Sequence, residues 1–349
     1  RGVRNFVVSQ VPKGYASDYP EANFLKVVNT LEALQRLAER HRDEFNIPIV
    51  GITGSNGKTM VKEWLHQLLS PSMFVTRSPR SYNSQIGVPL SVWLLNEQTQ
   101  VGVFEAGISQ PGEMLALRDI IQPTIAVLTY LGAAHQENFE SLEAKCREKI
   151  ILFHDADTIV YNGDDKTVSG VVNEYKDYKG EKLFWSFRDT KAPFFVKNVE
   201  KKGNLSIITY IYKGEEDSYS LPFIDEASVT NSIIAAVVSR RLGLSAEELD
   251  KRMALLEPVA MRLEVKEGQH GCTLINDSYN SDINSLDIAL DFMSRRPDHK
   301  GRRHTLILSD IFQSGESAKD LYHEVSDLCR KRGVVKFIGI GPQLCSQSD

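Results

Sequence analysis

The chain has 349 residues, of which 42% are hydrophobic and 25% are charged, and its formal net charge is −5. This composition excludes a disordered chain and is typical of a globular protein with two or three domains. The acidic balance gives no basic surface for nucleic acid, and no apolar stretch reaches the roughly 20 residues of a membrane span. We therefore expect no nucleic-acid partner and no membrane span.

The ends and the cysteines of the chain also carry information. A strand pattern is already under way at residues 3–8, and another, Val334 to Ile340, lies close to the last residue. We therefore expect the sequence to be a piece of a longer chain. Four cysteines lie far apart without a CxxC pair, which favours unpaired thiols in a reducing compartment: Cys146, Cys272, Cys329 and Cys345.

Three segments with different patterns follow one another along the chain. Residues 1–45 hold too little apolar sequence for a core and end in an amphipathic helix at residues 31–45. Residues 46–260 alternate strands and helices, which predicts a mainly parallel sheet. Within them, the alternation of residues 182–223 indicates antiparallel strands at the edge of that sheet. Residues 261–349 form a second α/β unit that looks incomplete.

The expected elements of the two α/β units come in a regular order. Strands are predicted at residues 47–53, 100–104, 124–129, 158–161, 273–275, 305–308 and 335–340, and helices at residues 58–69, 113–120, 141–153, 229–242, 285–293 and 318–332. The fold class is therefore α/β, with a central P-loop-type domain, a Rossmann-like C-terminal domain that is truncated, and a remnant of an N-terminal domain.

The strongest local signal is Thr53-Gly54-Ser55-Asn56-Gly57-Lys58-Thr59, which joins an apolar strand to a helix. Glycines let backbone N–H groups and the helix N-terminus point at one anion, Lys58 adds a positive charge, and the Thr59 hydroxyl is a ligand for Mg²⁺. The general pattern has glycine where Ile52 stands, so this is a shortened variant that uses Gly54. A glycine turn of purely structural purpose is the alternative. We predict ATP binding by Gly54, Ser55, Asn56, Gly57, Lys58 and Thr59.

Other polar residues near the expected strand ends each have an ordinary explanation. Glu105 ends a strand and is well placed for the Mg²⁺ that Thr59 contacts, but it could be a solvated loop carboxylate. His135 could bind a metal or be an ordinary polar loop residue. Asn83 is also a turn former and Asn231 also a helix N-cap. Lys149 is ordinarily a solvated surface charge.

The order of the loop, Glu105 and then His135 resembles the Mur ligases. The resemblance implies ATP and two Mg²⁺ ions, with Thr59, Glu105, His135 and a carbamylated Lys149 as metal ligands. The glutamate that follows this lysine by two residues in the family is Ile151 here. It also implies that Asn83 lies near the phosphates and Asn231 at the adenine. The catalytic residues would be Lys58, His135, Lys149 and Arg262.

A third region indicates a branch of this family. Met261-Arg262-Leu263-Glu264 and Asp277-Ser278-Tyr279-Asn280 resemble the branch that adds D-alanyl-D-alanine, although Asp282-Ile283 stands where Asn-Pro is usual. The resemblance implies that Arg262 reaches the ATP phosphates, Asp277 the ribose, and Tyr279 and Asn280 the base or the incoming dipeptide. From the residues alone, this second segment is equally a turn.

The resemblance implies a cytoplasmic enzyme of peptidoglycan synthesis that joins D-Ala-D-Ala to UDP-N-acetylmuramoyl-tripeptide through an acyl phosphate. Residues 1–45 would then be the remnant of a domain that binds the UDP substrate. Details are similar to the form fused to a C-terminal alanine racemase, so we expect a racemase in the parent chain. Because Lys58 and Arg262 lie on different units, we expect the units to close on the nucleotide. Another amino-acid ligase of the superfamily, a simple NTPase and a non-catalytic nucleotide-binding module remain alternatives.

Overall fold

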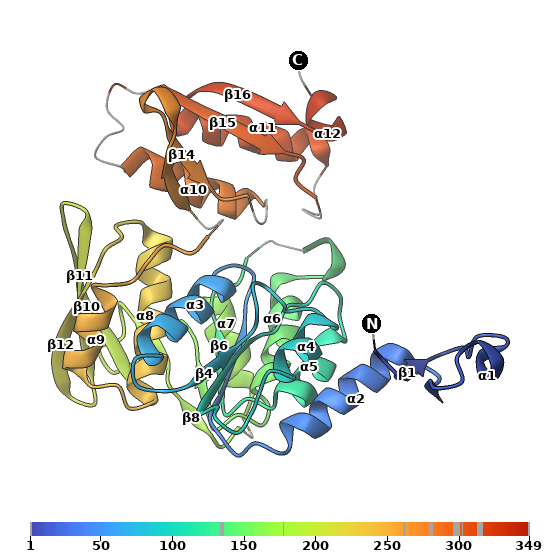
Figure 1. Ribbon diagram of the computed structural model, residues 1–349. Helices are drawn as coiled ribbons and strands as arrows, with labels where there is room; N and C mark the ends of the chain where they lie inside the picture. The colour runs from blue at the N-terminus through green and yellow to red at the C-terminus, as the bar shows by residue number, and fades with distance from the viewer. Residues whose placement is uncertain are drawn as a thin grey trace.

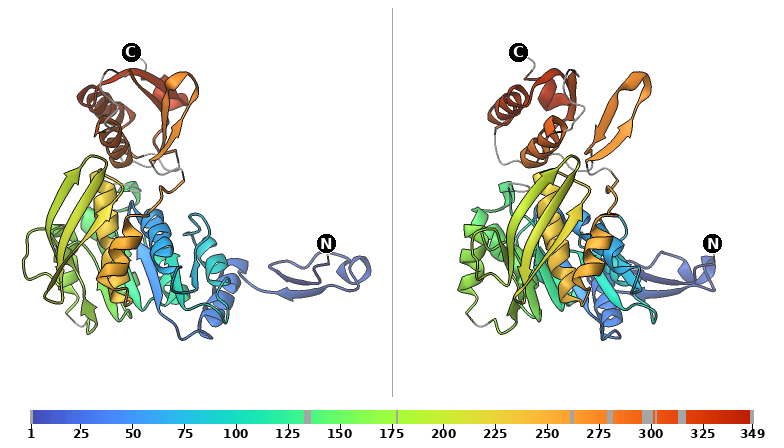
Figure 2. Two further views of the ribbon diagram at one scale, coloured as in Figure 1. Left: turned by 60° about the vertical axis from the view of Figure 1, so that its left-hand side comes forward. Right: turned by 90° about the vertical axis from the view of Figure 1, so that its left-hand side faces the viewer.

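The chain forms a central body, a smaller C-terminal unit and an N-terminal arm (Figure 1). The structure is a computed structural model that describes residues 2–132, 136–176, 178–260, 263–278, 282–295, 301, 303–312 and 317–347. The arm contains the parallel strands β1 (Asn5–Val8) and β2 (Asn23–Lys26) and the one-turn helix α1 (Tyr15–Asp18). Both views of Figure 2 show the arm projecting sideways from the body and the C-terminal unit lying above the body.

A parallel sheet forms the centre of the body, as predicted. All residues of its three middle strands are buried, because helices cover both faces. Among the described residues the strand order is β4-β5-β3-β6-β7-β8. The strands are β3 (Ile49–Thr53), β4 (Val75–Arg77), β5 (Val101–Glu105), β6 (Ile125–Leu128), β7 (Thr158–Val160) and β8 (Glu181–Lys182).

Helices pack on both faces of this sheet and form two apolar cores. One core joins the sheet to α3 and α8, and the other joins it to α4, α5, α6 and α7. The helix predicted for residues 141–153 ends at Lys149 and continues as a 3-10 turn, Ile150–Phe153. The helices of the body are α2 (Thr30–Arg42), α3 (Lys58–Leu69), α4 (Gly87–Val92), α5 (Glu113–Ile121), α6 (Leu142–Lys149), α7 (Lys166–Glu174), α8 (Glu226–Arg241) and α9 (Ala246–Met253); a short 3-10 helix spans Gln136–Asn138.

The antiparallel strands do not extend the parallel sheet, so that part of the prediction is wrong. They form a sheet of their own in the order β12-β11-β10-β9, in which the short strand β9 pairs with β10 in parallel. A bridge between Asn162 and Trp185 links this sheet to the body. Its inner face, which includes Ile208 and Tyr210, packs into the core of α3 and α8. Because only one face of this sheet is covered, apolar and polar residues alternate along its strands, and the apolar face lies against those helices. Its strands are β9 (Trp185–Ser186), β10 (Phe194–Lys202), β11 (Leu205–Tyr212) and β12 (Glu215–Leu221).

The C-terminal unit has its own apolar core, which includes Leu290, Leu321 and Leu344. Strands β13 and β14 pair antiparallel, and β15 and β16 pair in parallel. The elements are β13 (Glu264–Glu267), β14 (Thr273–Asn276), α10 (Ile283–Arg295), β15 (His304–Ser309), α11 (Ala318–Lys331), β16 (Val334–Ile340) and α12 (Pro342–Cys345), with a 3-10 turn at Gln269–Gly271. The α/β class is confirmed, and the predicted boundaries after residues 45 and 260 stay predictions.

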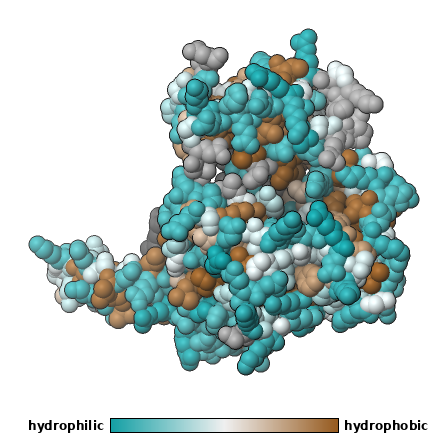
Figure 3. Space-filling model, turned by 180° about the vertical axis from the view of Figure 1, so that it is seen from behind, coloured by the Kyte–Doolittle hydropathy of each residue, from teal (hydrophilic) through white to brown (hydrophobic). Residues whose placement is uncertain are grey.

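The visible surface is largely hydrophilic on the face shown in Figure 3, with apolar residues scattered along the body and the arm. Within the residues that the structure describes, no helix combines the length and the hydropathy needed to cross a membrane.

Candidate active site

The predicted phosphate loop joins β3 to α3 and requires its glycines. Gly54 has φ +144° and Gly57 has φ +87°, which are backbone conformations that side chains disfavour. A Cβ on Gly54 would lie 2.1 Å from Thr129 Oγ1, and a Cβ on Gly57 would lie 2.5 Å from Asn231 Oδ1. The loop is therefore pressed against the segment after β6 on one side and against α8 on the other.

Hydrogen bonds fix the shape of this loop. The Ser55 N–H donates to the carbonyl of Tyr130 at 2.6 Å. The Ser55 hydroxyl donates to the carbonyl of Gly132 at 3.0 Å and accepts from its N–H at 2.9 Å. These bonds tie the loop to the segment that leads to the predicted ligand His135, which itself lies outside the described residues.

Lys58 begins α3 and folds back over its own loop. Its ammonium donates to the carbonyls of Gly54 at 2.7 Å and Ser55 at 3.1 Å. The positive charge thus lies inside the curve of the loop, beside the N–H groups at the start of α3. This arrangement is suited to an anion such as a phosphate.

Thr59, Glu105 and Asn83 come together as predicted, although their roles remain predictions. The Thr59 hydroxyl and the Asn83 amide donate to Glu105 Oε2 at 3.1 and 3.4 Å. Ser81, which sequence reasoning missed, lies 3.0 Å from the same hydroxyl. They meet because Glu105 ends β5, which pairs with β3 at Ile52, directly before the loop.

The oxygen atoms of this cluster are hard ligands of the kind that Mg²⁺ prefers. Among the described residues, no group of three His, Cys, Asp or Glu side chains converges as a complete metal site. One carboxylate and one hydroxyl suit a metal that takes its other ligands from substrate phosphates and water.

Lys149 is buried, so its interpretation as a solvated surface charge is wrong. Its Nζ donates to the carbonyl of Gly54 at 3.3 Å. Burial, and then the nearby charges of Lys58 and Lys145, hold the pKa of Lys149 well below its usual value. A lowered pKa favours the neutral amine, which is the form of a lysine that reacts with CO₂ to give a carbamate.

Lys145 is a second buried lysine at the loop, and sequence reasoning missed it. Its Nζ donates to the carbonyl of Gly132 at 2.5 Å. Burial lowers the pKa of Lys145 to about 8, with a further contribution from the charge of Lys58, against the opposing effect of Asp282. The sequence contained a signal, since Lys145 and Lys149 are four residues apart and share one face of α6.

Asn231 faces the phosphate loop from α8. The N-cap of this helix is Asp225, whose carboxylate accepts the N–H of Ser228 at 2.8 Å. The alternative explanation of Asn231 as an N-cap is therefore wrong. Its buried amide donates to the sulfur of Met60 at 3.3 Å, and its Oδ1 lies beside Gly57.

Lys62 is a third buried lysine, and like Lys145 it was missed by sequence reasoning. Its Nζ lies 3.1 Å from Glu105 Oε1, and neither side chain is exposed. The signal was again helical spacing, since Lys62 follows Lys58 by four residues and shares a face of α3 with Leu65 and Leu69. A lysine on an apolar face of a helix requires a partner in the core.

The predicted residues of the C-terminal unit are only partly described. Arg262, Tyr279 and Asn280 lie outside the described residues. Asp277 follows β14, and its carboxylate accepts the N–H of Leu263 at 3.3 Å. Asp282 precedes α10 and is buried. Tyr130 follows β6 in the body, and its pKa is raised by burial, by the charge of Asp165 and, third, by the charge of Asp282. The start of α10 is therefore close to the segment that supports the phosphate loop.

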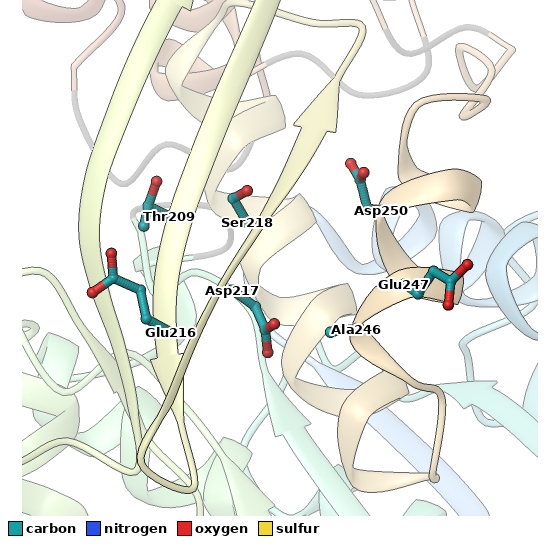
Figure 4. Close-up of a pocket in the computed structure, with 7 residues that line it drawn as sticks. All are labelled: Thr209, Glu216, Asp217, Ser218, Ala246, Glu247 and Asp250. Carbon is teal, nitrogen blue, oxygen red and sulfur yellow. The ribbon is translucent and has the colours of Figure 1, made fainter.

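A separate pocket of about 560 Å³ lies between β11, β12 and α9 (Figure 4). Its lining residues are Thr209, Glu216, Asp217, Ser218, Ala246, Glu247 and Asp250. Glu216 pairs with Lys197 at 2.7 Å, and Glu247 pairs with Lys251 at 2.7 Å. An acidic pocket repels phosphates, and these elements carry none of the predicted site residues, so we assign no nucleotide to it.

The site belongs to the class of nucleotide-binding α/β proteins in which a glycine loop, a lysine and a threonine hydroxyl stand between a buried parallel strand and a helix. A comparison with protein families narrows this class. The family described as the Mur ligase middle domain matches residues 52–239, which is more than half of the chain. The chain therefore belongs to the Mur ligase family.

Individual relatives agree with this family. The chain is 28% identical over 303 residues to the UDP-N-acetylmuramoyl-tripeptide–D-alanyl-D-alanine ligase of Bacillus subtilis, a match that covers 85% of this chain and 64% of that protein. It is 24% identical to the ligase of the same name from Escherichia coli, with 91% and 70% covered. The chain thus spans about two thirds of the length of these relatives.

Solved structures share the fold. The MurF structure from Acinetobacter baumannii superimposes with a TM-score of 0.83 at 21% identity, covering 98% of this chain and 73% of that one. MurF from Thermotoga maritima in complex with ADP gives a TM-score of 0.80 at 21% identity, covering 97% and 86%. The parallel sheet, the antiparallel sheet and the C-terminal unit therefore correspond to a known arrangement.

Proposed function

We propose that this chain is the ATP-dependent ligase part of an enzyme that joins D-alanyl-D-alanine to UDP-N-acetylmuramoyl-tripeptide in peptidoglycan precursor synthesis. The curated relatives from B. subtilis and E. coli carry this activity in their names. The observation that carries the proposal is the pairing of Thr59 with Glu105 at the phosphate loop, 3.1 Å apart, together with the buried Lys149 that donates to the carbonyl of Gly54 in that loop.

The reaction needs positioning and charge neutralisation rather than a nucleophilic side chain. The carboxylate of the tripeptide attacks the γ-phosphorus of ATP, the bond to the β-phosphate oxygen breaks, and an acyl phosphate and ADP form. The amine of D-Ala-D-Ala then attacks the acyl carbon, loses a proton and expels phosphate. Lys58 and Arg262 would offset the charge on the phosphoryl oxygens during transfer.

Two Mg²⁺ ions are part of this proposal. Thr59 and Glu105 would hold the first, and their oxygen atoms fit that ion. His135 and Lys149 would hold the second. When bound, the ions would polarise phosphoryl oxygens and neutralise their charge. An amine is a poor ligand for Mg²⁺, so Lys149 fits this role only after modification.

Carbamylation would provide that modification. The neutral amine of Lys149 attacks CO₂, an N–C bond forms and one proton is released, which leaves an anionic carbamate. Burial favours the first requirement, because it holds the pKa of Lys149 well below its usual value. The ammonium groups of Lys58 and Lys145, which are the charges that oppose protonation of Lys149, would then stabilise the carbamate.

The rest of the proposal concerns the parts around this site. Arg262, Asp277, Tyr279 and Asn280 would reach the nucleotide and the dipeptide when the C-terminal unit closes on the body. Residues 1–45 would be the remnant of the domain that binds the UDP group, and the parent chain would continue into an alanine racemase. We also propose a cytoplasmic location, which the four free cysteines and the use of ATP support.

The test is phosphate release from ATP and Mg²⁺ by the chain extended to its natural ends. UDP-muramoyl-tripeptide is supplied with D-Ala-D-Ala, D-glutamate or diaminopimelate. Release that requires D-Ala-D-Ala supports the proposal. Release with another amine alone would show a different amino-acid ligase, and release that ignores the amine would show a simple NTPase.

ATP binding without any release would show a non-catalytic module. The matched control is the variant Lys58→Met, which keeps the length of the side chain and removes its charge. It should lose release with every amine, because the charge that lies beside the start of α3 and that is proposed to offset the phosphoryl charge is gone.

A further inference from the structure

Lys62 is the residue of the site whose position is least explained by the chemistry above. It is fully buried, and a lysine is almost never fully buried without a partner, because its charge must be compensated there. Its ammonium contacts Glu105 Oε1 at 3.1 Å and Glu63 Oε1 at 3.0 Å. It also donates to the carbonyl of Ser78 at 2.9 Å and to that of Arg80.

The two oxygen atoms of the Glu105 carboxylate have different neighbours. Oε1 faces the ammonium of Lys62, whereas Oε2 accepts the hydroxyl of Thr59 and the amide of Asn83. Oε2 is therefore the oxygen on the side of Thr59, the other residue predicted to hold the first metal. Lys62 fixes this orientation, because rotation of the carboxylate would separate the buried charges.

Lys62 also holds the loop that brings the other polar groups to Glu105. Arg80 has φ +49°, a left-handed conformation that is unfavourable for residues with a side chain. Its carbonyl is one of the acceptors of Lys62. Ser81 and Asn83, which contact Thr59 and Glu105, follow directly in this loop.

The charges around Glu105 balance without a metal. Glu63 pairs with Arg77 at 2.9 Å as well as with Lys62. Among the residues that the structure describes, two carboxylates thus face two cations, which leaves no excess negative charge there for a free divalent ion. A bound nucleotide would supply that charge through its phosphates.

We propose that Lys62 is a positioning residue that makes Mg²⁺ binding depend on nucleotide binding. It neutralises Glu105 so that free Mg²⁺ is not retained, and it orients Oε2 for the ion that arrives with the phosphates. This inference rests only on the nucleotide and metal part of the proposed function.

The test measures the melting temperature of the whole chain with and without MgCl₂, in the absence of nucleotide, at a constant ionic strength set with KCl. The variant Lys62→Met keeps the aliphatic side chain and removes the counter-charge that contacts Glu105, so that added Mg²⁺ can take its place. We expect Mg²⁺ to raise the melting temperature of this variant by about 3 °C when the ion is at about ten times its dissociation constant. The wild type and the double variant Lys62→Met/Glu105→Gln should not respond.

A surface pair provides the matched control. Lys251 and Glu247 form an exposed ion pair at 2.7 Å, so Lys251→Met makes the same change of charge in solvent and should show no response to Mg²⁺. A response of the single Lys62 variant alone supports the proposal. Equal behaviour of the single and double Lys62 variants, or a wild type that responds as strongly, overturns it.

Loss of folding is also informative. A single Lys62 variant that fails to fold while the double variant folds supports charge compensation, because the double variant removes both charges. Failure of both variants contradicts it and leaves Lys62 a packing role. None of these measurements uses the ligase reaction, so absence of phosphate release with D-Ala-D-Ala would refute the proposed function without touching this inference.

Discussion

Gly57→Ala is the substitution for which the structure gives the sharpest expectation, because the chain contains a matched control. Gly57 precedes α3 with φ 87° and ψ −15°, and Gly112 precedes α5 with φ 85° and ψ −5°. Both alanines must adopt a left-handed conformation, which costs roughly 1–2 kcal/mol. The backbone contribution is therefore the same at the two positions.

The surroundings of the two glycines differ. A Cβ at Gly57 would lie 2.5 Å from Asn231 Oδ1, whereas a Cβ at Gly112 meets no atom within 4 Å. Asn231 is buried and has little room to move, and overpacking of this kind costs about 1–3 kcal/mol. We expect Gly57→Ala to lower the free energy of unfolding by about 1–3 kcal/mol more than Gly112→Ala does.

Urea unfolding of both variants measures this difference, and titration with ATP shows its effect on the site. We expect displacement of the loop in Gly57→Ala to cost about 1.4 kcal/mol of binding free energy, which corresponds to an ATP affinity about tenfold lower. Gly112→Ala should bind ATP as the wild type does. Addition of Asn231→Ala should restore part of the lost stability by removing the clash. Equal losses of stability at the two glycines would refute the steric argument.

Three further predictions concern individual side chains of the site. Thr59→Val should abolish the enhancement of ATP affinity by Mg²⁺, while Thr59→Ser keeps it, because only the hydroxyl contacts Glu105; isothermal titration with and without Mg²⁺ measures this, and equal enhancement in both variants would contradict the metal role. In ¹³C NMR spectra recorded with ¹³C-bicarbonate at neutral pH, the wild type should give a carbamate carbon signal that Lys149→Met lacks. The reason is that burial holds the pKa of Lys149 well below its usual value and keeps the amine reactive. Identical spectra of the two chains would exclude the modification. Lys145 has a pKa of about 8 in the folded chain, against an ordinary value of 10.5. Between these two values the unfolded state binds more protons than the folded state. The free energy of unfolding of the wild type should therefore rise with pH across that window, by up to roughly 3 kcal/mol relative to Lys145→Met. Urea unfolding from pH 7 to pH 10.5 checks this sign, and a constant difference between the two chains would show that Lys145 is not charged and buried at neutral pH.

The sequence predicts the parts of the site that local chemistry determines. The phosphate loop is visible because buried β-branched residues end at Thr53, glycines follow at positions with positive φ, and a lysine and a threonine begin the helix. Thr59 and Glu105 also meet as expected. Parallel strands align their carboxyl ends, so residues that end neighbouring strands must lie close together.

Sequence reasoning fails where tertiary packing decides the environment of a residue. The burial of Lys62, Lys145 and Lys149 becomes visible only when the helices that carry them are placed against the sheet. Asn231 was ambiguous because both Asp225 and Asn231 are good capping residues, and only the start of α8 distinguishes them. The antiparallel strands were recognised, but alternation alone does not say which layer covers their apolar face.

The distribution of charge around the loop has a consequence for the order of binding. Lys58, Lys145 and Lys149 direct their side chains at backbone carbonyls of the loop and of Gly132, which are weak partners for ammonium groups. Burial of an ammonium group costs free energy, and Lys149 meets that cost through its lowered pKa. A bound triphosphate would lower that cost for Lys145 and Lys149, which are both buried. Nucleotide binding should therefore precede tight metal binding and raise the pKa of Lys149, so carbamylation, which needs the neutral amine, is favoured before ATP arrives.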